Sequence, residues 1–187
     1  MSLLTTASQT VGPFVSIGFA QQKTDNLAVE GVSGERVTIR GRVVDGDGKP
    51  VIDACVETWQ ANAHGQYAHP DDAQGKTLNP AFRGFARSLT NDNGAYQITT
   101  VKPGHVPALG GALQAPHLAV IIFMRGLLRH LHTRIYFPAD ASNADDPVLK
   151  LVPAERRNTL IARKISAGVI EWNVILQGDA ETVFFDY

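Results

Sequence analysis

The chain has 187 residues, of which 44% are hydrophobic and 19% are charged, proportions typical of a folded globular protein. Its formal net charge is -1, so the sequence lacks the basic excess that binding to nucleic acid requires. The longest wholly apolar run, 118–124, is too short to cross a bilayer. We therefore expect one domain over residues 1–187, with neither nucleic acid nor a membrane as its partner.

The N-terminus and the cysteine content indicate a cytoplasmic protein. The first ten residues (MSLLTTASQT) show neither the basic start nor the apolar core of a secretory signal. Cys55 is the single cysteine, so it cannot form an intrachain disulfide, and its apolar neighbours predict a buried strand position. A reducing, cytoplasmic setting is expected.

In chain order, alternating apolar and polar residues predict a series of short β-strands separated by turns. The first strand is expected at 37–44 (VTIRGRVV), followed by the turn sequence DGDG at 45–48. Two more strands flank a second turn sequence, NDNG at 91–94. Those two are 86–90 and 96–101, and the remaining predicted strands are 51–52, 56–59, 118–124, 132–137, 172–176 and 182–185.

Helical character is confined to residues 153–164. Pro153 stands where a first helical turn would begin, Glu155 follows it, and Leu160 and Ile161 give the segment an apolar side. Strands this numerous, without intervening helices, favour an all-β fold. We expect an antiparallel β-sandwich with long loops and one short helix.

The residues alone identify no catalytic centre. His130 and His132 lie two apart on a predicted strand and share one face, which is a metal-ligand spacing, but no third ligand follows nearby. A structural or interface role is favoured for this pair, and a hydrogen-bonded structural role for His117. The acidic pairs 71–72 and 145–146 lie in predicted turns, where exposure to solvent is expected. No serine has the sequence context of an activated nucleophile.

A set of motifs, spread in order along nearly the whole chain, resembles the intradiol ring-cleavage dioxygenases. The resemblance is strongest to the alpha chains of the two-chain members that act on protocatechuate. It implies a β-sandwich that takes part in cleaving protocatechuate with dioxygen, between the two hydroxylated carbons, to 3-carboxy-cis,cis-muconate. The motifs are SQTVGPF at 8–14, WQAN at 59–62, GQY at 65–67, TVKPG at 100–104, APH at 115–117, RG at 125–126, HLHTRIYF at 130–137, DPVL at 146–149, and QG at 177–178 with ETVFFD at 181–186.

The catalytic members of this family hold Fe(III) with two tyrosines and two histidines, and this sequence departs from that set. Val106 stands in place of one tyrosine, Ala119 replaces the second histidine, and no tyrosine stands near Gln74, where the other is expected. His117 keeps the first histidine. An isopropyl and a methyl group offer no electron pair to ferric iron. The resemblance therefore implies an iron-free chain whose partner beta chain binds the Fe(III).

In the family, the N-terminal loop and an arginine of the alpha chain line the mouth of the beta chain's active site. The resemblance thus implies that Thr10, Gly12, Pro13 and Arg125 bind substrate, and that this chain contributes no catalytic or metal-binding residue. Gly12-Pro13 is a bend that can approach an aromatic ring closely, and Arg125 is a permanent cation for the substrate carboxylate. Residues 1–35 are expected to form an arm at the subunit interface of a larger hetero-oligomer of alpha–beta pairs.

Two alternatives remain at this point. One is a self-sufficient intradiol dioxygenase acting on catechol or hydroxyquinol, against which Val106 and Ala119 argue. The other is a non-catalytic, transthyretin-like binding sandwich, against which the motifs at 10–13 and at Arg125 argue. The polar, turn-rich segment 61–82 is expected to be functional or to lie against a neighbouring chain, because plain connections are shorter.

Overall fold

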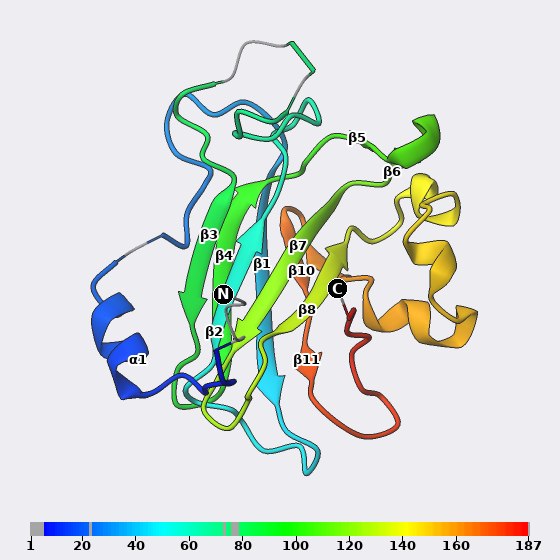
Figure 1. Cartoon of the computed structure of the whole chain (residues 1–187). Coiled ribbons are helices and arrows are strands. Elements are labelled where there is room, and N and C mark those ends of the chain that lie inside the picture. The colour runs from blue at the N-terminus through cyan, green and yellow to red at the C-terminus, as the bar shows by residue number, and fades with distance from the viewer. Residues whose placement is uncertain (1–5, 23, 73, 76–78, 187) are drawn as a thin grey trace, which may run out of the picture.

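A computed structural model of the chain describes residues 6–22, 24–72, 74–75 and 79–186. Two β-sheets pack face to face, and a short α-helix, α1 (Pro13–Phe19), lies beside them (Figure 1). The first sheet contains β1 (Arg36–Val44), β4 (Ala95–Val101), β9 (Arg163–Ser166), β10 (Val169–Glu171) and β11 (Val174–Ile175). The second has the order β3 (Phe85–Leu89), β2 (Cys55–Trp59), β7 (His117–Phe123) and β8 (Leu131–Tyr136).

Smaller elements occupy the connections. A short hairpin pairs β5 (Val106–Pro107) with β6 (Leu113–Gln114). The 3-10 helices are η1 (Leu109–Gly111), η2 (Ala141–Ala144), η3 (Leu149–Leu151) and η4 (Ala154–Thr159). Among the described residues, no helix is long and apolar enough to span a membrane.

The core lies between the two sheets because their strands alternate as the sequence predicts. In β1, Val37, Ile39 and Val43 are buried, whereas Arg36 and Arg40 are exposed. Burying one such aliphatic side chain contributes about 1.5–3 kcal/mol, so this cluster is a major source of stability. The partners from the second sheet are Val56, Leu118, Val120, Ile122 and Ile135.

Antiparallel pairing dominates, which confirms the predicted antiparallel β-sandwich. All neighbours in the second sheet are antiparallel, and so are β1 and β4. The exception is the other edge of β1, which pairs in parallel with β10 and then with β11. These two short strands share one edge of β1 in succession. The predicted strand 172–176 is thus shortened to β11, and β10 before it was not predicted.

The predicted helix at 153–164 is shorter than expected and is not an α-helix. The segment begins as the 3-10 helix η4, and β9 follows it. The N–H of Tyr136 donates to the Leu160 carbonyl at 2.8 Å, and the N–H of Ala162 donates to the Tyr136 carbonyl at 2.9 Å. Because these bonds tie the segment to the end of β8, they divert backbone groups that a continuing helix would need.

The α-helix of the described residues lies instead at the N-terminal arm. It begins at Pro13, whose fixed φ suits a first helical turn, and Gly12 before it is extended. At the other end of the chain, the strand predicted at 182–185 is wrong. It reduces to an isolated bridge between Phe185 and His132.

The outer face of the second sheet, turned away from the core, positions both candidate sites. At one end of this face Trp59 of β2 lies opposite Ala119 of β7, which lies opposite Arg134 of β8. At the other end Cys55 lies opposite Phe123. The first end leads toward the small β5–β6 hairpin, and the second leads to the turn that follows β7 (Figure 1).

Candidate functional site

A cavity of about 590 Å³ lies at the end of the sheet marked by Trp59. The ring of Trp59 stacks on that of Tyr67, with centroids 6.0 Å apart and planes 10° apart. Val106 and Gln74 also line this cavity. These are the two positions where the family resemblance places tyrosine ligands, so the structure brings both altered tyrosine positions to one cavity with aromatic side chains in its wall.

Close backbone packing holds the long polar segment 61–82 against the strand that carries Val106. Gly65 has a φ of +76°, and a Cβ atom there would collide with the carbonyl oxygen of His105. Any side chain at this position would push the segment away from its neighbour. Described residues of this segment, among them Tyr67 and Gln74, form a wall of the cavity, and its function or contact with another chain stays a prediction.

Only one of the two histidine positions keeps an imidazole. Ala119 contributes a methyl group, and His117 is buried with its Nδ1 donating to the Ala115 carbonyl at 2.7 Å. Burial, together with the nearby Arg134 guanidinium, lowers the pKa of His117 to about 4. In the described part of the chain, no group of three or more His, Cys, Asp or Glu side chains could hold a metal ion. One imidazole, beside the methyl group of Ala119 and the isopropyl group of Val106, does not make up the donor set that holds Fe(III).

The buried His117 predicts how stability depends on pH. Its folded pKa is about 4, below the ordinary value of 6.5, so the unfolded chain takes up a proton first as the pH falls. The free energy of unfolding is therefore expected to decrease as the pH falls from 6.5 toward 4. The contribution of this one group between pH 7 and pH 5 is about 2 kcal/mol. Urea unfolding at the two pH values measures it.

His117→Gln should remove most of this slope while keeping a donor for the Ala115 carbonyl. The matched control is His105→Gln, the same substitution at an exposed histidine. Equal slopes in the wild type and in His117→Gln would show that His117 is not the group responsible.

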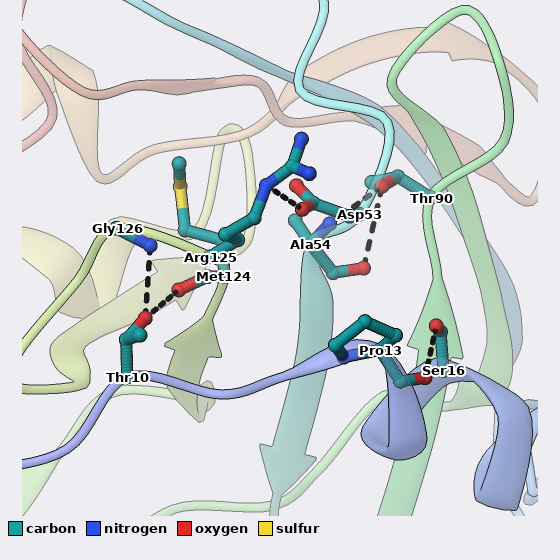
Figure 2. A network of polar contacts seen from close by, with 9 residues as sticks. All are labelled: Thr10, Pro13, Ser16, Asp53, Ala54, Thr90, Met124, Arg125 and Gly126. Carbon is teal, nitrogen blue, oxygen red and sulfur yellow. Dashed lines mark hydrogen bonds and ion pairs between the residues drawn. The ribbon is translucent and has the colours of Figure 1, made fainter.

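The residues expected to bind substrate lie near one another at the opposite end of the same sheet face, and Figure 2 shows three of them, Thr10, Pro13 and Arg125. Gly12, Pro13 and Arg125 line a hollow of about 260 Å³. Gly12 and Pro13 come from the start of α1, and Arg125 comes from the turn after β7. Residues more than 100 positions apart in the sequence are thus brought together.

Thr10 fastens the N-terminal segment to that turn. Its hydroxyl donates to the carbonyl of Met124 at 3.3 Å and accepts from the N–H of Gly126 at 2.8 Å (Figure 2). Thr10 thus holds both neighbours of Arg125 in the chain. The structure brings together all four predicted residues, and it assigns Thr10 a supporting contact.

Sequence reasoning missed Asp53, which lies in the same hollow. Its Oδ2 is 3.2 Å from Nε of Arg125, and the Arg125 side chain is 76% exposed. An ion pair this exposed contributes about 0–1 kcal/mol, so it restrains Arg125 weakly. No motif marks Asp53, since it comes from the loop before β2 and meets Arg125 only in the fold.

The two hollows are separate. They share no lining residue: Trp59 at one end of β2 lines the first, and Asp53, just before the other end, lines the second. The four residue steps along β2 from Cys55 to Trp59 span about 13 Å. Residues 10–13 and Arg125 are therefore too far away to contact a ligand between Val106 and Gln74 of their own chain.

The other candidate residues, His130, His132 and Cys55, pack against neighbouring side chains of the sheet. The rings of His130 and His132 meet edge to face with centroids 4.6 Å apart, and His130 also contacts Phe123. Burial, followed by the His130 neighbour, lowers the pKa of His132. Cys55 is buried as predicted, and burial raises the pKa of its thiol to about 11. A thiol with so high a pKa is not a nucleophile near neutral pH.

Comparison with known proteins also indicates a dioxygenase. The family model described as "Dioxygenase" matches residues 11–178. In solved structures, the dioxygenase domain of a carbohydrate-binding fusion protein from Streptomyces sp. SirexAA-E superposes with a TM-score of 0.62. It is 21% identical and covers 86% of this chain and 89% of that one. The chain belongs to the intradiol dioxygenase family of oxidoreductases, as its motifs predict.

Within the family, similarity to an alpha chain extends over nearly the full length of this protein. The protocatechuate 3,4-dioxygenase alpha chain of Pseudomonas putida is 40% identical over 198 residues, covering 97% of this chain and 96% of that one. The beta chain of the same enzyme from Burkholderia cepacia is 39% identical over 132 residues, covering 70% of this chain and 56% of that one. The predicted resemblance is confirmed, and the transthyretin-like alternative finds no support.

Proposed function

We propose that this chain is the alpha subunit of a protocatechuate 3,4-dioxygenase and that it completes a substrate pocket in a partner beta chain. The observation that carries the proposal is the position of the hollow containing Gly12, Pro13 and Arg125. That hollow lies at the end of the sheet opposite the altered ligand positions of its own chain. At that place the cation of Arg125 and the bend at Gly12 and Pro13, which allows close approach of a ring, suit a ligand held by a second chain.

The division of labour follows from the donor chemistry. Val106 and Ala119 supply no electron pair, and His117 offers a single imidazole, since its Nδ1 donates to a backbone carbonyl and only Nε2 remains. One imidazole is too small a donor set for ferric iron, so the Fe(III) is assigned to the beta chain. When bound there, the ferric ion supplies the activation of the catecholate for reaction with dioxygen. This chain binds and orients: Arg125 faces the substrate carboxylate, while Gly12 and Pro13 contact the ring. The self-sufficient alternative would need ligands that these positions do not provide.

The proposal extends to the assembly. Residues 1–35 form the arm that reaches the partner, of which residues 6–22 and 24–35 are described, and several alpha–beta pairs form a cytoplasmic hetero-oligomer. Phe14 and Ile17 of α1 support this view. Their side chains are 84% and 65% exposed and lie three residues apart, on one side of the helix. Large apolar groups exposed together are typical of an interface.

Co-expression with a beta chain tests the proposal. The two chains are expected to purify together and to consume dioxygen with protocatechuate, while neither the alpha chain alone nor a mixture with an unrelated protein does so. A beta chain that binds no alpha chain, and that cleaves protocatechuate equally well without it, would contradict the proposal.

The chain made alone is predicted to bind no stoichiometric Fe(III) and to lack the reddish tyrosinate charge-transfer colour. The reason is the loss of ligands at Val106 and Ala119. Metal analysis and a visible spectrum after loading with ferric iron measure both properties. One equivalent of tightly held iron in the purified chain would show that other side chains replace the missing ligands.

A further inference from the structure

Arg87 of β3 lies at the centre of a cluster that joins the sheet to the N-terminal arm. Its guanidinium pairs with Glu57 of β2: Nη2 lies 2.6 Å and Nε 2.8 Å from the same carboxylate oxygen. The two side chains are only 15% and 17% exposed. A partly buried pair with two charge-assisted contacts holds the guanidinium plane in one orientation.

The guanidinium also contacts the arm directly. Its Cζ atom lies 3.6 Å from the ring centroid of Phe19, the last residue of α1, and 5.2 Å from that of Phe85. The backbone of Arg87 adds a second attachment, since its N–H donates to the Thr24 carbonyl at 3.2 Å. Two residues of the arm, Phe19 and Thr24, therefore dock on the same residue of the sheet.

These contacts matter because α1 cannot hold its own position. It has seven residues and buries none of them, whereas isolated helices shorter than about 12–15 residues are marginal in water. Thr10 fastens the arm before α1, and the Phe19–Arg87 contact fastens it at the end of α1. Gly12 and Pro13 lie between these two attachments.

We propose that Arg87 is a positioning residue that, through its stacking contact with Phe19, holds the N-terminal segment in place for substrate binding. The contact fixes the end of α1 and thereby sets where Gly12 and Pro13 lie before the partner and the substrate arrive. Pre-organisation of this kind lowers the entropy lost on binding. The role in catalysis rests on the proposed function, whereas the fastening of the arm is a property of this chain by itself.

The first test measures hydrogen exchange of the α1 amides in the full-length chain. Phe19→Leu is the principal variant, because it removes the aromatic face and leaves the Arg87–Glu57 pair intact. The loss of a cation–π contact is expected to speed exchange by about three- to tenfold. The matched control is Phe14→Leu, the same substitution on an exposed residue of the same helix, which should leave exchange unchanged. Equal exchange in the two variants would overturn the proposal.

A second variant addresses the guanidinium. Arg87→Lys keeps a cation beside Glu57 but loses the flat surface that stacks on Phe19, so its exchange rate should fall between those of the wild type and Phe19→Leu. Exchange as slow as in the wild type would show that charge alone fastens the arm and would overturn the stacking role. Thermal unfolding of each variant confirms that the comparison is made between folded chains.

The second test uses the alpha–beta complex. Phe19→Leu is expected to raise the KM for protocatechuate about three- to tenfold with kcat changed less than about twofold, because the segment must be ordered before it binds. Faster exchange with an unchanged KM would overturn the positioning role. Failure of the proposed function would give a different result. In that case the activity of the wild-type beta chain would not depend on the alpha chain at all.

Discussion

Replacing Arg125 with alanine is expected to weaken the binding of protocatechuate to the alpha–beta complex by about 10- to 100-fold. A charge-assisted hydrogen bond to a carboxylate contributes about 1.5–3 kcal/mol, and about 1.4 kcal/mol corresponds to a factor of ten. Arg125 is available for this contact because its pairing with Asp53 is exposed and therefore weak. Steady-state kinetics and direct substrate titration measure the loss.

The specificity of the effect separates recognition from support of the interface. Catechol lacks the carboxylate, so its turnover should hardly change in Arg125→Ala, and the iron spectrum of the beta chain should stay the same. Arg129→Ala is the matched control, since Arg129 is an exposed arginine near Arg125 in the connection between β7 and β8. Equal losses for protocatechuate and catechol would mean that Arg125 holds the subunits together rather than binding the acid.

Much of the sandwich could be predicted because period-two alternation records burial directly. The segment 37–44 shows this, with β1 spanning Arg36–Val44 and its inward residues buried. The turn at 91–94 was predictable from its side chains: Asn91 Oδ1 accepts from the N–H groups of Asn93 and Ala95, and Gly94 has a φ of +68°. These signals are local, so a single sequence carries them.

Elements whose conformation depends on distant partners could not be predicted. The sequence of residues 153–164 favours a helix, but backbone groups of Leu160 and Ala162 form hydrogen bonds with the end of β8. No local sequence signal predicts those bonds. The helix α1 has a usable signal, because Gly12 followed by Pro13 suits a helix start, although the same pair also suits a simple bend. Its last residue, Phe19, contacts Arg87, which lies far along the chain.

For the candidate site, the sequence supplied identities through resemblance but no geometry. The departures at Val106 and Ala119 could be seen in the motifs, because a single substitution at a ligand position removes the donor atom. The meeting of Gly12 with Arg125 could not, since it requires the register of the second sheet. The role of Asp53 could not be predicted either, because an acidic residue in a loop is ordinarily solvated and its contact with Arg125 arises only in the fold.

Asp146 corrects another expectation, namely that the acidic pair 145–146 is exposed. Its side chain is fully buried. Its Oδ1 accepts from the Tyr136 hydroxyl at 2.9 Å and from the N–H groups of Val148 and Leu149 at 2.9 and 2.7 Å, while Oδ2 accepts from the N–H of Ala115 at 2.8 Å. One carboxylate thus ties the entry to β7, the end of β8 and the start of η3 together.

Asp146→Asn is therefore expected to lower the free energy of unfolding by about 2–4 kcal/mol. The asparagine amide has the shape of the carboxylate, but its NH₂ group must face a donor on whichever side it points. Hydrogen bonds to a charged group contribute about 1.5–3 kcal/mol each, and a buried donor left without an acceptor adds a further cost. For a chain of this size the melting temperature should fall by about 5–15 °C.

The neighbouring residue provides a control with the same change in charge. Asp145 is 88% exposed and pairs only with Lys150 in the described structure, so Asp145→Asn should shift the free energy of unfolding by no more than about 0.5 kcal/mol. Urea titrations of both variants at pH 7 make the comparison. If the two substitutions cost the same, the bonds of Asp146 would contribute no more than a surface ion pair. The link from the altered ligand region through Ala115 and Tyr136 to η3 would then rest on apolar packing alone, through Leu149 and Leu160.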